Sequence, residues 1–394
     1  MLTDNLTYHR EHPERFQTGL VLPIAAGHFI NDIYTALIAP ILPVIIERLS
    51  LSLTQAGSLM AIMQLPALFN PLIGYLADKI NLRYFVILAP AITATLISCI
   101  GFAPNYFNLA LLLFSAGVSV AAFHAPAPAM IGRVSGKKVG LGMSLFMAAG
   151  ELGRTVGPLL AVWAVTIWTL DGFYRVVIMG WAASLILFWR LRLVTATPEK
   201  PGHLRAIIPV LRNLFLPLAL LNLFRNFALE SLTTFLPTFL SLEGASLWFA
   251  GGALSILELA GVVGALLSGT ISDKLGRRFI LFTAALLSSI LLLIFLNTKG
   301  WLLVPLLLLL GFTTISTTPI QLAMVQEHLP KNRAVGNGLY MVIGFLLRPV
   351  ATLAIGLLGD AFGLKQAYLY SALLSFLALP AILALPGAKD HPEK

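Results

Sequence analysis

The sequence predicts an all-α integral membrane protein with twelve transmembrane helices, arranged as two six-helix bundles with both termini in the cytoplasm. Three observations carry this prediction: the scarcity of charge, the length of the apolar segments, and a repeat at about half the chain length. Charged residues make up 11% and apolar residues 58% of the 394, whereas soluble domains have about 25% charged and about 45–50% apolar residues. We therefore expect a lipid bilayer to solvate most of the surface.

Apolar segments long enough to cross a bilayer, which takes about 20 helical residues, alternate with short polar breaks. In the first half they are predicted at 19–46, 54–77, 84–103, 107–133, 139–168 and 173–191. In the second half they are predicted at 212–241, 246–271, 279–297, 301–328, 334–359 and 366–386. The polar stretch 192–211 is the longest interruption. We expect it to be a cytoplasmic linker between a bundle at 1–191 and a bundle at 212–394.

The net charge of +9 is placed as membrane topology requires, and it does not indicate a nucleic-acid partner. With a cytoplasmic N-terminus, 19 of the 26 lysines and arginines lie on the inner side, and the outer loops hold only Arg48, Arg175, Lys299 and Lys365. Cytoplasmic loops are enriched in these residues. We therefore expect a multi-pass protein of the cell inner membrane. The first eighteen residues lack the basic start of a signal peptide, so the first span is expected to be retained.

Nothing in the composition indicates an enzyme, a cofactor or a metal centre. The single Cys99 excludes a disulfide, and the seven histidines show no paired H-x-x-x-H spacing. Neither a nucleophile–base motif nor a metal-ligand set is present, so we expect no catalysis, no cofactor and no metal.

The two halves repeat one another, as in many secondary transporters. GYLADKINLR at Gly74–Arg83 recurs as GTISDKLGRR at Gly269–Arg278, and Pro43 recurs as Pro237. The second copy matches the loop signature G-x-x-x-D-[RK]-x-G-[RK]-[RK] and resembles the major facilitator superfamily. The first copy departs from it at Asn81 and Leu82. The resemblance implies alternating access, a monomer, and a cytoplasmic gate formed by Asp78, Lys79, Asp273, Lys274, Arg277 and Arg278.

Within that superfamily the chain is most similar to the fosmidomycin-resistance efflux group. The residues that carry this resemblance are His28-x-x-Asn31-Asp32, Phe123-His124, Ser135-Gly136, Gly157-Pro158-Leu159-Leu160-Ala161 and Gln326-Glu327-His328-Leu329-Pro330. Gly153-x-x-x-Gly157-Pro158 also resembles the helix 5 signature of antiporters, and a packing kink explains it equally well. Four charges depart from the group's pattern and argue against fosmidomycin itself as the substrate: Glu151, Arg154, Glu258 and Arg348.

Seven ionisable side chains lie deep in the predicted spans, where each is costly and marks a cavity, a partner or a proton relay. They are Asp32, Glu151, Arg154, Arg225, Glu230, Glu258 and Arg348. They fall on spans 1, 5, 7, 8 and 11, which line the cavity in the superfamily. The acids Asp32, Glu151, Glu230 and Glu258, together with His28, are the candidate proton carriers.

Four polar residues share one face of the first span, at about 100° per residue: His28, Asn31, Asp32 and Thr35. We expect this face to line the cavity, with Asp32 exchanging a proton and His28 tuning it. Asp32 could instead stay ionised and tie its helix to a neighbour. His124 is expected to support helix packing beside Pro126 and Pro128, and a role at the edge of the cavity is the alternative.

Substrate is expected to meet Asn31, Arg154, Arg225, Asn226 and Arg348. Buried guanidinium groups bind carboxylates and phosphates in bidentate fashion, so the three arginines favour a small organic anion. Local pairing is the alternative: Arg154 with Glu151 three residues away, and Arg348 with Glu230 or Glu258. Arg225 and Glu230 lie about 140° apart on an ideal helix and need not pair.

These features predict a proton-coupled antiporter that exports a small organic anion or drug-like compound by alternating access. Proton-coupled uptake of an organic anion is the rival within the same class. A membrane sensor or scaffold that transports nothing is the alternative from another class, but it would not need acids and bases in both halves.

Overall fold

The computed structural model describes residues 15–70, 73, 83–192, 210–329 and 333–386, and every regular element in these ranges is helical. Backbone contacts divide the chain into two compact units. Unit 1 comprises residues 1–38 and 66–199, and unit 2 comprises residues 39–65 and 200–394. The predicted boundary at 192–211 stays a prediction, because most of that stretch lies outside the described residues.

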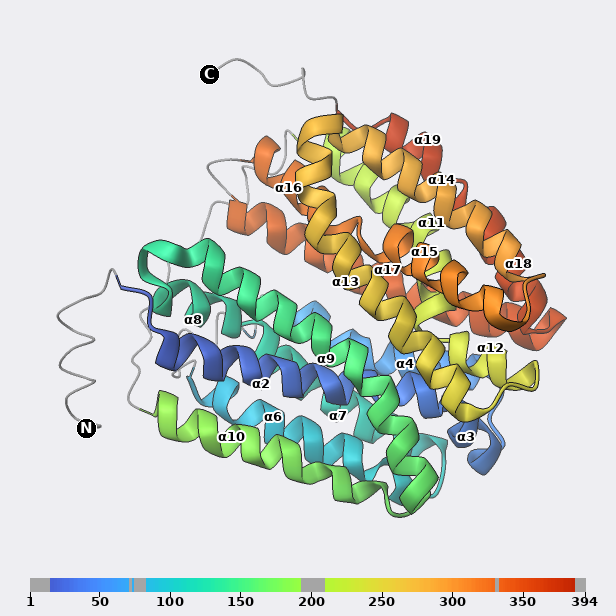
Figure 1. Ribbon diagram of the computed structural model, residues 1–394, viewed down its shortest axis with the longest axis horizontal. Coiled ribbons are helices and arrows are strands. Elements are labelled where there is room, and N and C mark those ends of the chain that lie inside the picture. Colours follow the sequence, from blue (N-terminus) through green and yellow to red (C-terminus); the bar gives the residue numbers. More distant parts are fainter. Residues whose placement is uncertain (1–14, 71–72, 74–82, 193–209, 330–332, 387–394) are drawn as a thin grey trace. The chain divides into compact units, whose positions relative to one another are not determined.

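Unit 1 is built from long helices that lie side by side (Figure 1). They are α2 (Thr18–Ala36), α6 (Arg83–Ser98), α7 (Tyr106–His124), α8 (Ala127–Val134), α9 (Val139–Trp168) and α10 (Ile178–Leu191). Short 3₁₀ turns at Leu65–Phe69, Cys99–Phe102, Gly136–Lys138 and Phe173–Val177 connect or extend them. Helix α2 packs against α9, α6 and α10, and its residue Ile24 shares a buried core cluster with Phe123 and Phe146. Unit 1 therefore has α2 at its centre.

Unit 2 contains the remaining helices. They are α3 (Ile38–Leu49, apart from its first residue), α4 (Leu53–Gln64), a π-turn at Leu211–Phe215, α11 (Leu216–Thr233), α12 (Leu236–Leu242), α13 (Leu247–Leu275), α14 (Arg277–Phe295), a 3₁₀ turn at Gly300–Leu302, α15 (Leu303–Ile315), α16 (Thr318–His328), α17 (Arg333–Phe362), α18 (Leu364–Ser375) and α19 (Ala378–Leu383). Helix α17 packs against α4, α11 and α18, and α13 packs against α15.

Prolines explain where the helices break. A proline ring clashes with the carbonyl of the residue four positions earlier, so a helix tends to stop there. Helix α2 ends at Ala36, four residues before Pro40, and α7 ends at His124, four before Pro128. The same relation holds in unit 2, where α11 ends at Thr233 before Pro237 and α15 ends at Ile315 before Pro319. Spans 1, 4, 7 and 10 are therefore broken helices.

Ten helical segments of the described chain are long and apolar enough to cross a membrane, and Leu53–Phe69 is a shorter apolar helix. Their bounds agree closely with the predicted spans. Phe173–Leu191 coincides with one of them, and helix α9, Val139–Trp168, coincides with another. Span 54–77 is described only in part. Span 212–241 is the polar, broken helix pair α11 and α12 and is not among the ten.

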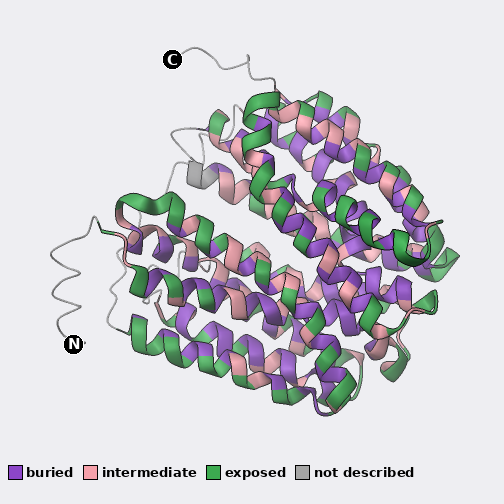
Figure 2. Ribbon diagram, viewed as in Figure 1, coloured by how far each residue is buried: buried purple, intermediate pink, exposed green. Residues whose placement is uncertain are grey.

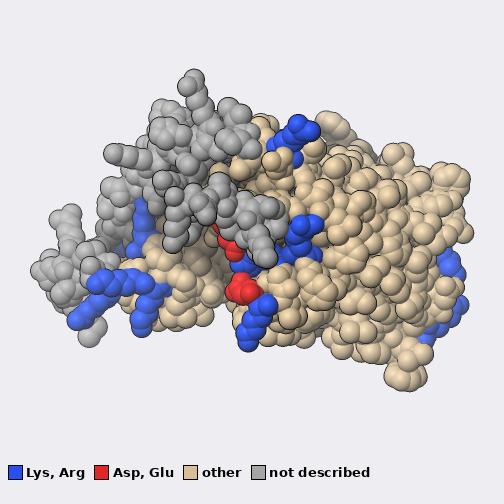
Figure 3. All heavy atoms as spheres, turned by 90° about the horizontal axis from the view of Figure 1, so that it is seen from above, with Lys and Arg blue, Asp and Glu red and all other residues tan. Residues whose placement is uncertain are grey.

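The outward faces of the helices are apolar, as a bilayer requires. Large side chains that are more than half exposed include Trp189, Trp301 and Phe279. Figure 2 shows exposed residues along the outer faces of the helices, and Figure 3 shows a broad part of the visible face without charged side chains. These observations confirm the prediction of a multi-pass, all-α membrane fold.

Candidate functional site

Each unit buries its own group of polar and charged side chains. The unit 1 cluster consists of His28, Asp32, His124, Glu151 and Arg154, from α2, α7 and α9. The unit 2 cluster consists of Arg225, Glu230, Thr234, Arg348 and Thr352, from α11, α17 and the residue that follows α11. Ion pairs among the intramembrane charges join Asp32 and Glu151 to Arg154, and Glu230 to Arg348, and each pair lies within one unit.

Close contact between α2 and α9 positions the unit 1 cluster. A Cβ atom added at Gly153 would lie 2.4 Å from the backbone oxygen of Phe29, and one at Gly150 would lie 2.4 Å from the His28 ring. One added at Gly157 would lie 2.6 Å from the Cβ of Ala36. The glycines of the helix 5 motif therefore let two helices approach where a larger residue could not.

Two histidines and one aspartate converge at the centre of the unit 1 cluster. The Nε2 atoms of His28 and His124 lie 3.1 Å apart. They lie 3.4 Å and 3.2 Å from the two carboxylate oxygens of Asp32, respectively. The Nδ1 atom of His28 bonds the backbone oxygen of Phe146 at 2.8 Å, and that of His124 bonds the oxygen of Val120 at 2.9 Å. These three side chains are held in one arrangement by contacts from three helices.

Arg154 links the carboxylate of Glu151 to this centre. Its Nη2 atom forms a close ion pair with Oε1 of Glu151, and its Nη1 atom lies 3.9 Å from Oδ2 of Asp32. The local pair of Glu151 and Arg154, given above as the alternative to substrate binding, is therefore present. Arg154 is a partly exposed side chain, while Asp32 is 3% exposed, so the cluster runs from the interior of unit 1 toward its surface.

Three of these side chains could also hold a metal ion. The ligand atoms of His28, Asp32 and His124 all lie within 4.8 Å of one another. Spacing along the chain does not reveal this group, because His124 comes from a different helix. The sequence expectation for His124, helix packing with a role at the cavity edge left open, did not include its contact with Asp32. The Phe123-His124 pair of the family resemblance could have suggested that contact.

The unit 2 cluster is built on Glu230, which is fully buried. Its Oε1 atom accepts a hydrogen bond from Nε of Arg348 at 2.6 Å. Its Oε2 atom accepts hydrogen bonds from the hydroxyl groups of Thr234 at 2.9 Å and Thr352 at 3.0 Å. Of the two acids considered for Arg348, the structure selects Glu230. The two threonines were not predicted, and each lies four residues from a member of the pair.

Arg225 lies beside this pair and is 7% exposed. Its Nη2 atom donates to the backbone oxygen of Thr314 at 2.5 Å, and its buried Nε atom has no hydrogen-bond partner in the described structure. Glu230 and Arg348 are nearby charges. Arg225 therefore bonds a carbonyl, whereas Arg154 and Arg348 each bond a carboxylate.

The other predicted residues occupy different places. Asn31, Asn226 and Glu258 are buried, and the side-chain amide nitrogens of both asparagines have no hydrogen-bond partner in the described structure. The predicted gate residues Asp78 and Lys79 lie outside the described residues. Asp273 and Lys274 are exposed at the end of α13.

Arg277 organises the described part of the predicted gate. It lies 2.8 Å from Asp273, donates from Nε to Glu327 at 2.8 Å and from Nη1 to the Ser272 hydroxyl at 2.9 Å. The next residue, Arg278, bonds the backbone oxygen of Leu383. Glu327 is an acid that the loop signature did not include, although it belongs to the Gln326-Glu327-His328 sequence noted above. These contacts tie the start of α14 to α13, α16 and α19.

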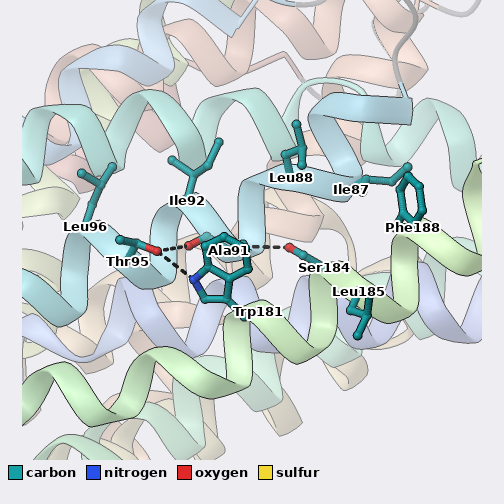
Figure 4. A pocket seen from close by; sticks show the side chains of 10 residues that line it. All are labelled: Ile87, Leu88, Ala91, Ile92, Thr95, Leu96, Trp181, Ser184, Leu185 and Phe188. Atoms are coloured by element: carbon teal, nitrogen blue, oxygen red, sulfur yellow. Dashed lines mark hydrogen bonds between the residues drawn. The ribbon is translucent and has the colours of Figure 1, made fainter.

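A groove of about 460 Å³ on unit 1 is lined by none of the cluster residues (Figure 4). It runs between α6 and α10, and apolar side chains such as Leu88, Ile92 and Leu185 line it. Trp181 donates to the Thr95 hydroxyl at 3.1 Å at its edge. Leu185 and Trp181 are more than half exposed, so this groove belongs to the apolar outer face.

Comparisons with known proteins agree with this architecture. A family model described as the Major Facilitator Superfamily matches residues 24–352. The fosmidomycin resistance protein of Escherichia coli (strain K12) is 25% identical over 93% of this chain and 93% of its own length. The multi-drug resistance efflux pump PmrA of Streptococcus pneumoniae is 24% identical over 84% of this chain and 87% of its own.

Solved structures show the same fold. A bacterial homologue of the human lysosomal transporter Spinster, in an inward-facing unoccupied conformation, matches with a TM-score of 0.82 and 17% identity, covering 94% of this chain and 97% of its own. A D-xylose–proton symporter matches with a TM-score of 0.74 and 16% identity, covering 95% of this chain and 99% of its own.

Proposed function

The chain belongs to the major facilitator superfamily, and from that premise we propose that it is a proton-coupled antiporter that exports a small organic anion or drug-like compound by alternating access. Relatives named for fosmidomycin resistance and multidrug efflux support export. Buried acid–base groups in both units support coupling to protons. The observation that carries the proposal is the pair of Glu230 and Arg348, which links a fully buried carboxylate to a partly exposed cation.

The burial of Glu230 makes its charge depend on Arg348. An ionised carboxylate inside a protein is strongly disfavoured unless a cation and hydrogen bonds stabilise it. Arg348 is its ion-pair partner in the described structure, and Thr234 and Thr352 supply hydroxyl groups. Whatever draws Arg348 away therefore favours protonation of Glu230, and protonation of Glu230 releases Arg348. Binding at one group is thereby linked to binding at the other.

This linkage fixes how the charge of the substrate relates to the direction of proton movement. A cationic drug-like compound that bonds ionised Glu230 competes with the proton, so it is exchanged for protons. An organic anion that bonds Arg348 favours the proton on Glu230, so the two travel together. Export in exchange for protons is therefore the outcome that this pair favours for a cationic or polar drug-like compound. Of the two substrate classes proposed for export, the Glu230–Arg348 pair thus supports the drug-like compound and not the organic anion.

Proton-coupled uptake of an organic anion is the second candidate, and Arg225 favours it. Two guanidinium groups, Arg225 and Arg348, lie near one carboxylate, Glu230. Arg225 bonds the carbonyl of Thr314 and has an unbonded Nε atom in the described structure. The unit 2 cluster thus carries one positive charge in excess among these three groups, which suits an anion.

Purified full-length protein in liposomes distinguishes the candidates. A panel of phosphonates, carboxylates and lipophilic cations is added under an imposed pH gradient, while substrate content and internal pH are followed. Export in exchange for protons predicts that substrate accumulates in vesicles with an acidic interior and that protons leave as it enters. Anion uptake predicts that protons and substrate enter together, and a sensor or scaffold moves neither.

The variant E230Q separates coupling from binding. We expect it to abolish substrate-dependent proton movement, because glutamine cannot exchange a proton. Glu243, an exposed glutamate that caps the end of α12, supplies the matched control E243Q, which is expected to keep wild-type coupling. Proton movement that persists at the wild-type ratio in E230Q would refute the assignment of Glu230.

A further inference from the structure

We propose that His28, Asp32 and His124 form a binding site for a first-row divalent metal ion, for which Zn²⁺ is the test ligand. The site lies wholly in unit 1 and involves none of the unit 2 groups on which the transport proposal rests. Equilibrium binding of the ion can therefore be measured independently of whether the chain exports its substrate in exchange for protons.

The hydrogen bonds of the two rings determine which nitrogen atoms are available. A backbone carbonyl only accepts hydrogen bonds, so Nδ1 of His28 must donate to Phe146 and Nδ1 of His124 must donate to Val120. In the neutral rings both Nε2 atoms then carry lone pairs. These lone pairs lie 3.1 Å apart and next to the Asp32 carboxylate. Acceptors this close need either a proton on one of the rings or a metal ion that all of them bind.

The spacing of these atoms suits a metal ion. A tetrahedral ion with bonds of about 2.0–2.1 Å holds its ligand atoms about 3.3 Å apart. The two Nε2 atoms lie 3.1 Å apart, and those of His124 and His28 lie 3.2 Å from Oδ1 and 3.4 Å from Oδ2 of Asp32, respectively. With one ligand atom from each residue, the three atoms all lie within 4.8 Å of one another. Two imidazoles and one carboxylate are a ligand set of zinc and other first-row divalent ions.

The surroundings hold the ligands in this arrangement. Metal-binding histidines usually donate their other ring N–H to a carbonyl or carboxylate, which fixes the ring and its tautomer. Both rings do so here. The His28 ring also stacks on Phe146 with centroids 3.9 Å apart, and Gly150 provides the room for it. One oxygen of Asp32 is buried without a hydrogen bond in the described structure.

Charge and access also agree with this site. Asp32 and Glu151 carry two negative charges against the single positive charge of Arg154, so the cluster with neutral rings has one negative charge. The side chain of Asp32 is 4% exposed, whereas that of His124 is 29% exposed. The ion can therefore enter past His124, and the same side leaves a fourth position for water.

Metal binding is tested on full-length protein in detergent, purified with a tag that contains no histidine and stripped with a chelator. Zn²⁺ content is measured after equilibration, and Co²⁺ absorption reports tetrahedral coordination. We expect one tightly held ion per chain in the wild type. H124Q and D32N each remove a ligand and should weaken binding at least about 100-fold, and G150A, which displaces His28, should weaken it about 10–100-fold.

His328 supplies a matched control. Its Nδ1 atom bonds the carbonyl of Met324 at 2.8 Å, four residues earlier, just as His124 bonds Val120, but it belongs to no described metal-ligand group. H328Q should bind zinc like the wild type. X-ray absorption of the wild-type complex should show two imidazole ligands, and this measurement does not depend on any variant folding. Wild-type protein that binds no zinc would leave a shared proton as the occupant and overturn the proposal. Zinc retained unchanged in H124Q and D32N would show that the ion binds elsewhere and would overturn it too.

Discussion

At the scale of single residues, the Glu230–Arg348 pair is unequal in its burial. Glu230 is fully buried, whereas the side chain of Arg348 is 38% exposed. Removing the partner of a buried charge is costly, because the charge left behind is uncompensated, while a partly exposed charge can be solvated instead. The two members of the pair should therefore respond differently to mutation.

We expect R348Q to destabilise the fold by about 3–5 kcal/mol, because it leaves the Glu230 carboxylate buried without its cation. E230Q should cost about 1–2 kcal/mol, because Arg348 can reach solvent and glutamine retains an acceptor for a threonine hydroxyl. Thermal unfolding of the purified variants in detergent measures both. The double variant should be more stable than R348Q alone. Equal losses for the two single variants would contradict this account of the pair.

The sequence indicates which residues are charged and buried but not which of them meet. Hydropathy reveals Asp32, Glu230 and Arg348 because any charge in an apolar span stands out. It cannot choose between Glu230 and Glu258 as the partner of Arg348, since both lie in apolar spans and their distance from Arg348 depends on tertiary packing. His124 was underestimated for the same reason, because its partner Asp32 lies on another helix.

At the scale of helices, the contact between α4 and α17 depends on glycines of α17 and on a cap. The carboxylate of Asp360 accepts hydrogen bonds from the backbone N–H groups of Leu53 at 2.7 Å and Thr54 at 2.8 Å, at the start of α4. A negative charge near the N-terminus of α4 also interacts favourably with the positive end of the helix dipole. One turn earlier on α17, a Cβ atom added at Gly356 would lie 2.6 Å from the backbone oxygen of Leu53.

G356A should therefore destabilise unit 2 by about 1–3 kcal/mol, because a backbone oxygen cannot yield to the added methyl group. Gly344 on the same helix has nothing within 4 Å of its added Cβ, so G344A is the matched control. It should be neutral or stabilising by up to about 1 kcal/mol, since alanine favours the helix. Thermal unfolding again gives the comparison, and equal effects of both variants would show that the α4–α17 contact does not limit stability.

The helix boundaries were the most predictable part of the fold, and the assignment of helices to units was the least. Length, hydropathy and the polar breaks predict helices such as α9, Val139–Trp168, to the residue, and the prolines account for the breaks within spans. No local signal shows that residues 39–65 associate with the second half of the chain. That association arises from packing of α4 on α17, which is separated from it by most of the sequence.

At the scale of the whole molecule, the contact of α4 with α17 joins a helix of the first half of the sequence to one of the second. Alternating access requires such a contact to open and close during transport. A Cβ atom added at Gly359 would lie 3.5 Å from Cβ of Leu53, within the usual range of about 3.5–4.5 Å for a disulfide. The pair L53C/G359C, with Cys99 replaced by serine, can therefore hold the contact closed.

We expect oxidation of this double variant to form the disulfide and to stop transport in liposomes, and reduction to restore it. The single variants L53C and G359C, each in the same background, should transport equally well under both conditions. The physical reason is that a covalent link removes any state in which the ends of α4 and α17 separate, and a transporter confined to one state cannot complete its cycle. Full transport by the cross-linked protein would show that this contact stays closed throughout, and the moving boundary between the halves would then have to lie elsewhere.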